Sequence, residues 1–282
     1  MEVLKSKKIL QDFIERQREM GKKIGFAPTM GALHDGHLSL YKMAREENDL
    51  VVSSIFVNPT QFNNTEDLEK YPRDINRDIS ILEKSGLVDA VYVPEVTDIY
   101  PEKTESQHYN FDGLEDEMEG KSRPGHFDGV GTVVKRLFEI IQPTHSYFGE
   151  KDFQQLQIIK KLVQKYKIPV NVIGCPIHRE KNGLAMSSRN ERLSETERKE
   201  AALIFKTLTA SKKMFGTKTA NEVSNFVKKT FENHPKFSLE YFQIADEATL
   251  KPCLRKSKNK KYRAFIAVFV NNIRLIDTIS LN

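Results

Sequence analysis

Short apolar runs alternate with amphipathic helical patterns along the chain, up to about residue 175. Five apolar runs predict strands, and the four segments between them predict helices. The predicted strands cover 23–28, 50–58, 89–94, 145–149 and 169–174, and the predicted helices cover 36–47, 74–85, 129–141 and 153–166. Strands that alternate with helices are typical of βαβ units, so the pattern predicts a parallel sheet covered by helices.

The pattern changes from Ser194 onward. Helical patterns cover 195–215 and 220–233, and strand-like stretches cover 239–246 and 262–277. Helices followed by paired strands predict a small α+β domain, with a boundary near 176–193. We therefore expect an α/β protein with a Rossmann-like parallel-sheet domain over residues 1–176 and a smaller C-terminal α+β domain over residues 177–282, which agrees with the usual size of domains.

Residues 102–127 interrupt the alternation, because this segment is polar and rich in Asp, Glu and Gly. We interpret it as an insertion or a lid-like loop.

The N-terminal segment MEVLKSKKILQDFIERQREM predicts an amphipathic helix, with Leu10, Phe13 and Ile14 on one face. It is too charged for a signal peptide, and no apolar run approaches the roughly 18 residues of a membrane span. Cys175 and Cys253 lack paired or metal-type spacing, as is typical of reduced thiols. These features predict a soluble, cytoplasmic protein without a membrane partner.

The net charge of +5 comes from one segment. Lys251–Arg263 holds seven basic residues and no acidic residue, and the remainder of the chain carries a net charge of −2. Such a run is usually a solvated loop, so we expect no nucleic-acid partner. An RNA-binding module that acts through this run is the alternative.

The stretch PTMGALHDGHLSL, residues 28–40, follows the first predicted strand and holds His34 and His37 around Asp35-Gly36. If a helix begins near Asp35, both imidazoles lie at its N-terminus, where free N–H groups and the helix dipole favour a phosphate. Neither a P-loop nor a G-x-G-x-x-G motif is present, so a phosphate would depend on this arrangement. The alternative is that the histidines only cap or pack the helix.

Polar residues also follow the other predicted strands, at the edge where ligands bind in parallel sheets. Gln61 can offer a donor and an acceptor to a small ligand, whereas Asn58 precedes a proline and fits a turn. Lys151 suits phosphate, while Asp152 could accept from a ribose or cap a helix. The guanidinium of Arg189 can bind a phosphate through two hydrogen bonds, although its segment is also typical of a linker that leads into a helix.

The segment SRPGHFDGVGTVV places Arg123, Gly125 and His126 immediately before a predicted helix. It predicts either a further anion pocket or only the start of that helix.

The motifs PTMGALHDGHLSL, FVNPTQF, YPRD, RPGHFDGVGTVV, FGEKDFQQL and GLAMSSRN, in this order, resemble the pantothenate synthetase (pantoate–β-alanine ligase) family. The resemblance runs from about Gly25 to Leu193. It implies that pantoate attacks the α-phosphate of ATP to form pantoyl adenylate and pyrophosphate. β-Alanine then attacks the adenylate, which releases AMP and pantothenate. It also implies a homodimer.

The resemblance implies a role for each residue that matches a family motif. His37 would be a catalytic acid supported by His34, and Lys151 and Arg189 would complete the catalytic set. The implied ATP-binding residues are Met30, Gly31, Ala32, Leu33, His34, Asp35, Gly36, His37, Gly149, Glu150, Lys151, Asp152, His178, Met186, Ser187, Ser188 and Arg189, and the implied substrate residues are Asn58, Gln61 and Gln155. The C-terminal domain would close over this site.

Two positions differ from the family pattern. Members often have an acidic pair where this chain has Arg77-Asp78, so we expect Mg²⁺ mainly on the ATP phosphates, with Asp78 as a candidate ligand. His178 stands where an aliphatic residue is usual, a change that is tolerable if only its backbone contacts adenine. An adenylyltransferase of the same superfamily is the second functional hypothesis, because His34 and His37 alone would also suit it.

Overall fold

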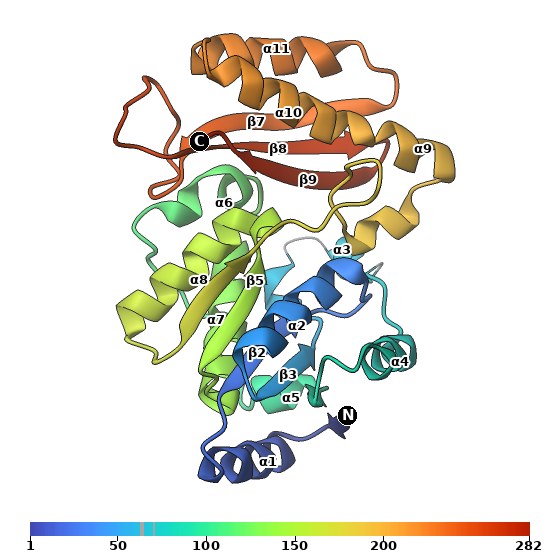
Figure 1. Ribbon diagram of the computed structural model, residues 1–282, viewed down its shortest axis with the longest axis vertical. Helices are drawn as coiled ribbons and strands as arrows, with labels where there is room; N and C mark the ends of the chain where they lie inside the picture. The colour runs from blue at the N-terminus through green and yellow to red at the C-terminus, as the bar shows by residue number, and fades with distance from the viewer. Residues whose placement is uncertain (63–64, 70) are drawn as a thin grey trace.

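A computed structural model of the chain describes residues 1–62, 65–69 and 71–282. Six parallel strands form one sheet in the order β1-β4-β3-β2-β5-β6 (Figure 1). The strands are β1 (Glu2–Leu4), β2 (Ile24–Thr29), β3 (Leu50–Ile55), β4 (Ala90–Tyr92), β5 (His145–Gly149) and β6 (Asn171–Cys175). The predicted parallel sheet is therefore confirmed, and its five predicted strands are all present.

Helices cover both faces of this sheet, because the side chains of each strand alternate between the two faces. Phe26, Val52 and Phe148 pack in a core with α1, α7 and α8, whereas their neighbours Ala27 and Val51 pack with α2 and α4. The helices of this part are α1 (Lys7–Glu19), α2 (Asp35–Glu47), α3 (Thr65–Glu69), α4 (Ile75–Ser85), α5 (Val96–Ile99), α6 (Met118–Ser122), α7 (His126–Ile141) and α8 (Phe153–Tyr166). Apolar side chains on both faces explain why the strands read as continuous apolar runs.

The structure adds a strand that the pattern did not predict, and it starts one helix earlier than predicted. Strand β1 was not predicted. It has three residues and buries only Leu4, so the sequence shows no apolar run where this strand pairs with β4. Helix α7 begins at His126, before the predicted start at Gly129. A Cβ atom at Gly129 would lie 2.4 Å from the carbonyl oxygen of Thr60, so this helical glycine is required by the close approach of the 58–61 turn.

Residues 109–127 are anchored by buried side chains, whereas residues 102–108 are exposed. Tyr109, Phe111, Leu114 and Met118 are all buried in the core that also contains α7 and α8. Short helical turns supply Leu114, in η2 (Leu114–Asp116), and Met118, in α6, whereas Tyr109 and Phe111 lie in the irregular segment before them. A few apolar residues widely spaced in a polar sequence therefore anchor the second half of the segment, which differs from what a lid-like loop would show and agrees with an insertion.

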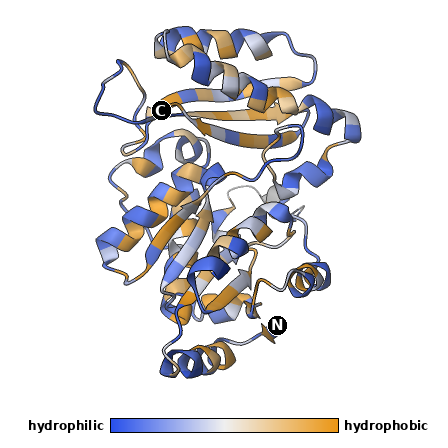
Figure 2. Ribbon diagram, viewed as in Figure 1, coloured by the Kyte–Doolittle hydropathy of each residue, from blue (hydrophilic) through white to orange (hydrophobic). Residues whose placement is uncertain are grey.

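A second, antiparallel sheet follows, with the order β7-β8-β9. Its strands are β7 (Phe237–Asp246), β8 (Tyr262–Val270) and β9 (Ile273–Ser280), and its helices are α9 (Glu195–Glu200), α10 (Ala202–Phe215) and α11 (Ala220–Glu232). The predicted stretch 262–277 is thus a hairpin, and the predicted helix 195–215 is two helices. Helices α10 and α11 cover one face, and the apolar strands lie beneath their apolar sides (Figures 1 and 2).

The two sheets belong to parts of the chain that meet through charged side chains. Glu119 of α6 is buried and accepts two hydrogen bonds from Arg274 of β9, at 2.9 and 2.7 Å, and one from the Tyr241 hydroxyl at 2.7 Å. Arg263 of β8 pairs with Glu150 at 3.1 Å. These contacts place β9 beside the turn that follows β5.

The basic run is only partly a surface feature. Arg263 is buried in ion pairs with Glu150 and Glu247, and Lys260 pairs with Asp246. Lys251, Arg255 and the other lysines of this loop are exposed. Both cysteines are free thiols. Among the described residues, none of the helices combines the length and the apolar composition needed to span a membrane.

Candidate active site

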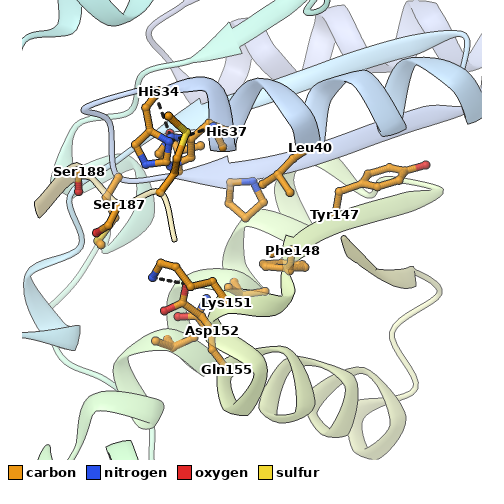
Figure 3. Close-up of a pocket in the computed structure, with 18 of the residues that line it drawn as sticks. His34, His37, Leu40, Tyr147, Phe148, Lys151, Asp152, Gln155, Ser187 and Ser188 are labelled. Carbon is orange, nitrogen blue, oxygen red and sulfur yellow. Dashed lines mark hydrogen bonds and ion pairs between the residues drawn. The ribbon is translucent and has the colours of Figure 1, made fainter. Parts of the chain in front are cut away.

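A pocket of about 240 Å³ opens at the carboxyl ends of the central strands (Figure 3). It receives residues from the turns after β2, β3, β5 and β6 and from the 186–189 segment. The predicted residues that line it are Met30, His34, Gly36, His37, Asn58, Gln61, Gly149, Lys151, Asp152, Gln155, His178, Met186, Ser187, Ser188 and Arg189. The structure therefore brings together side chains that are more than 150 residues apart in the sequence.

Five residues predicted to bind ATP lie outside the lining formed by the described residues. Ala32 and Leu33 are buried, and Asp35 is exposed. The Glu150 carboxylate pairs with Arg263, and Gly31 precedes the buried residues of the same turn. The part of these five residues in ATP binding therefore stays a prediction.

His34 and His37 lie at the N-terminus of α2, as predicted. The Nδ1 atom of His34 accepts a hydrogen bond from the Gly36 N–H at 3.1 Å, and Nδ1 of His37 accepts from the His34 N–H at 3.3 Å. A neutral imidazole that accepts at Nδ1 carries its proton on Nε2. Both rings, whose centroids are 4.1 Å apart, can therefore donate from Nε2 to a ligand.

Gly36 is required by this arrangement. A Cβ atom at this position would lie 2.8 Å from Cε1 and 2.9 Å from Nδ1 of His34. Any larger residue would therefore displace the His34 ring, which caps the helix.

Both imidazoles are neutral at pH 7. Burial lowers the pKa of His34 to about 4, with a further contribution from the Lys151 ammonium. Burial also lowers the pKa of His37 well below its ordinary value, and His34 and Lys151 act in the same direction. At neutral pH the pair can therefore donate hydrogen bonds, but neither ring holds an extra proton to transfer.

Asp78 supports the turn that follows β2. It is buried, and its two carboxylate oxygens accept hydrogen bonds from the backbone N–H groups of Ala32 at 2.9 Å and Leu33 at 2.8 Å. Burial raises the pKa of Asp78, and these two hydrogen bonds oppose that change. Among the described residues, no cluster of three or more His, Cys, Asp or Glu side chains could hold a metal ion. This geometry favours a structural role for Asp78 over the predicted metal-binding role.

The turn after β3 presents two buried amides. The Asn58 amide donates to the Gly129 carbonyl at 3.1 Å and its oxygen accepts from the Tyr100 hydroxyl at 2.6 Å, so Asn58 is held tightly in the turn. The backbone carbonyl oxygen of Gln61 is 2.8 Å from Nδ1 of His126. Gln61 is 8% exposed and lines the pocket with Asn58, and its side-chain amide donates to the Met30 sulfur at 2.7 Å and accepts from the Asn58 amide at 3.3 Å.

The cationic side of the pocket comes from two further segments. Lys151 lies in η3 (Glu150–Asp152), and its ammonium is 3.1 Å from the Asp152 carboxylate. Arg189 lies in η4 (Ser188–Arg192), after Ser187 and Ser188. Figure 3 shows Lys151 across the cavity from the histidines, and the two serines on the histidine side. A polyanion in this pocket would meet two cations and two imidazole donors.

His178 also lines the pocket. Its backbone carbonyl accepts a hydrogen bond from the Met186 N–H at 3.0 Å, which joins the 176–178 segment to the loop that carries Ser187 and Ser188.

A second cavity, of about 430 Å³, extends the site toward the antiparallel sheet. It shares Lys151, Asp152, Gln155, Ser187 and Arg189 with the first pocket. Its far wall is formed by residues that the sequence did not single out, including Tyr241, Phe269 and Arg274. No sequence motif identifies these residues, because they lie within strands β7, β8 and β9, whose sequences resemble those of any strand in a sheet.

Tyr71 was also missed as a site residue. It lines the first pocket, and its hydroxyl is 3.4 Å from Oγ of Ser188. A sequence signal was available, because Tyr71 begins the motif YPRD. Arg123 and His126, for which two interpretations were open, line the second cavity.

Comparison with known proteins identifies relatives of the whole chain. The family described as pantoate-beta-alanine ligase matches residues 2–280. A pantothenate synthetase of Flavobacterium psychrophilum is 62% identical over 275 residues, which cover 98% of this chain and 96% of that protein. A pantothenate synthetase of Aquifex aeolicus is 46% identical over 278 residues, which cover 98% of this chain and 97% of that protein.

Solved structures have the same fold. The pantothenate synthetase of Thermus thermophilus superposes with a TM-score of 0.91 at 39% identity and covers 100% of this chain and 99% of its own. The pantoate-beta-alanine ligase of Francisella tularensis superposes with a TM-score of 0.80 at 37% identity and covers 100% of this chain and 98% of its own. That structure is a complex with beta-gamma ATP and beta-alanine.

Proposed function

The chain belongs to the pantoate–beta-alanine ligase family, and on this premise we propose that it condenses pantoate with β-alanine through a pantoyl-adenylate intermediate. One observation carries the proposal. His34, His37, Lys151 and Arg189 line one pocket together with the amide of Gln61, so a polyanion and a small polar substrate can be held side by side. The structure of the Francisella relative is a complex with beta-gamma ATP and beta-alanine, which supports the same substrate classes for this chain.

In the first step a pantoate carboxylate oxygen attacks the α-phosphorus of ATP, and the bond from that phosphorus to the bridging oxygen of pyrophosphate breaks. A carboxylate is already a nucleophile at pH 7, so this step needs orientation and relief of charge repulsion rather than a base. Lys151 and Arg189 would supply positive charge along the triphosphate. Gln61 and Gln155 would hold the hydroxyl and carboxylate of pantoate.

We propose a hydrogen-bond donor role for His37, with His34 in support, in place of the predicted role as an acid. Each Nε2–H is fixed by the hydrogen bond at Nδ1, so it can meet the charge that develops on the α-phosphate without transferring its proton. The positive end of α2 acts in the same direction.

In the second step the β-alanine nitrogen attacks the activated carbonyl carbon, the bond from that carbon to the AMP oxygen breaks, and the amine loses a proton. The nucleophile is the unprotonated amine, so this step is expected to speed up as the pH rises. Asn58 and Gln61 would receive β-alanine, with Asn58 acting mainly by holding the turn in place.

Further features belong to the same proposal. Mg²⁺ would enter with ATP as part of the substrate, because the carboxylate of Asp78 is occupied by backbone N–H groups. Residues 1–176 would bind the nucleotide and pantoate, and residues 177–282 would close over them. We also propose a cytoplasmic homodimer, as the family resemblance implies.

Pantoate-dependent exchange of labelled pyrophosphate into ATP, without β-alanine, tests the proposed intermediate directly. The purified protein should catalyse this exchange, because adenylation is reversible before pyrophosphate is lost. Addition of β-alanine should then yield AMP and pantothenate. Folded protein that lacks exchange would contradict the adenylate mechanism, and a product that retains the nucleotide would indicate an adenylyltransferase instead.

Replacement of Gln61 by alanine is expected to raise KM for pantoate by about tenfold or more, while KM for ATP changes less. The buried polar groups of pantoate would lose a partner, at a cost of about 1–3 kcal/mol. Initial rates at varied pantoate and varied ATP separate the two effects. Gln11→Ala, an exposed glutamine on α1, is the matched control. Equal losses for both substrates would contradict the assignment.

A further inference from the structure

An exposed ion pair joins α4 to η4, the turn that supplies Ser188 and Arg189 to the first pocket. Arg77 donates from one guanidinium nitrogen to Glu191 at 2.7 Å and from the other at 3.4 Å, so the pair is bidentate. The side chains are 44% and 43% exposed, and 114 residues separate them in the sequence. The pair therefore connects the parallel-sheet part of the chain to the segment that supplies Arg189.

Glu191 lies close to groups that would bind the nucleotide. It follows Arg189 by two residues in the same 3₁₀ turn, and both Ser188 and Arg189 line the pocket. Its charge also acts on His34, which lines the same pocket. Burial and Lys151 lower the pKa of His34, whereas the carboxylate of Glu191 acts to raise it. A negative charge at this place would repel a bound triphosphate.

The η4 turn does not need the ion pair to keep its position. The Asn190 amide donates to Glu180 at 2.8 Å and to the Ala185 carbonyl at 3.0 Å, and the Ser187 hydroxyl caps the turn. An exposed ion pair contributes little to stability by comparison. Arg77 would therefore affect the pocket through its positive charge and not by holding the η4 turn in position.

We propose that Arg77 is a positioning residue for ATP, which acts by neutralising Glu191 so that the carboxylate does not repel the triphosphate held by Arg189 and Lys151. This inference rests on the proposed function of the pocket. It assigns no contact between Arg77 and ATP. It predicts instead that the effect of losing Arg77 depends on whether Glu191 carries its charge.

A double-variant experiment tests this dependence. Arg77→Ala is expected to raise KM for ATP by about three- to tenfold, which is the scale of an exposed charge interaction, with kcat and the KM values for pantoate and β-alanine unchanged. Glu191→Gln should not raise KM for ATP. The double variant should return to within about twofold of the unmodified protein, and added salt should weaken the defect of Arg77→Ala.

Lys84→Ala is the matched control, because it removes an exposed positive charge from the same helix at its other end. A defect that persists fully in the double variant would overturn the inference, since Arg77 would then act independently of Glu191. An unchanged KM for ATP in Arg77→Ala would also overturn it, as would a Glu191→Gln variant as defective as Arg77→Ala.

The inference and the proposed function fail in different ways. Pyrophosphate exchange by the unmodified protein tests the function and does not depend on Arg77. The dissociation constant for ATP, measured by calorimetry without pantoate, tests the charge effect even if catalysis is absent. In this measurement Arg77→Ala is expected to have the lowest affinity for ATP, and the double variant is expected to regain the affinity of the unmodified protein.

Discussion

Replacement of His37 by alanine is expected to slow formation of pantoyl adenylate by about thirty- to a thousandfold. This corresponds to the roughly 2–4 kcal/mol lost when one preorganised donor to a developing charge is removed. The Nε2–H of His37 is preorganised because its Nδ1 is held by the His34 backbone N–H at 3.3 Å. Single-turnover measurement of adenylate formation, or pyrophosphate exchange at saturating ATP, reports this barrier directly.

The loss should appear mainly in the rate and less in ATP affinity, because a bond that strengthens in the transition state affects the chemical step. His108→Ala, which changes an exposed histidine, is the control and should leave exchange unchanged. Unaltered exchange in the His37 variant would remove this residue from the mechanism.

The pH dependence separates a donor from an acid. Burial lowers the pKa of His37 well below 6.5, so the ring is neutral throughout the range from about pH 6 to 8 in the unliganded site. The exchange rate of the unmodified protein should therefore show no loss over this range that depends on His37. A decline above neutral pH that disappears in the His37 variant would show instead that the protonated imidazole is the active form.

Replacement of Glu119 by alanine is expected to destabilise the folded protein by about 3–5 kcal/mol. The variant would leave Arg274 partly buried, without the acceptor that now takes two of its hydrogen bonds, and would remove the partner of Tyr241. Chemical denaturation or thermal melting measures the loss. Glu232→Ala, at an exposed position in α11, is the control and should change stability by less than about 0.5 kcal/mol.

Acid titration gives a second measure of the same contact. Burial alone would raise the pKa of Glu119, but the hydrogen bonds and charge of Arg274 outweigh it, and the pKa falls to about 2 from an ordinary 4.5. A carboxyl group whose pKa is lower in the folded state stabilises it above the unfolded pKa. This stabilisation, about 3 kcal/mol, is therefore expected to disappear as the pH falls from about 4.5 toward 2.

The conservative variant Glu119→Gln distinguishes charge from packing. It keeps the shape of the side chain and removes the charge, so it should be less stable than the unmodified protein at pH 7 and should lose the part of the acid dependence that comes from Glu119. Equal stability of the two proteins at pH 7 would contradict a stabilising role for this ion pair.

The sequence by itself predicted the parallel sheet, most of its helices and the family, because each of these depends on local information. Buried strands require runs of apolar residues, and helices that cover a sheet require apolar residues at helical spacing. Both patterns can therefore be recognised from residues that are close in the sequence. The motifs around His34, Gln61, Lys151 and Arg189 were visible for the same reason, since each is one short stretch of sequence, and the first three directly follow a strand.

Other features were decided only by the tertiary structure, because they depend on residues far apart in the chain. Strand β1 exists because β4 pairs with it, and residues 109–118 are held in place because four separated apolar side chains reach one core. Asp78 was predicted as a metal ligand candidate, yet its carboxylate is occupied by the turn after β2. The pairs Glu119–Arg274 and Arg77–Glu191 join residues more than 100 positions apart. A charged residue looks the same in the sequence whether it faces solvent or a partner, and only folding determines which partner it meets.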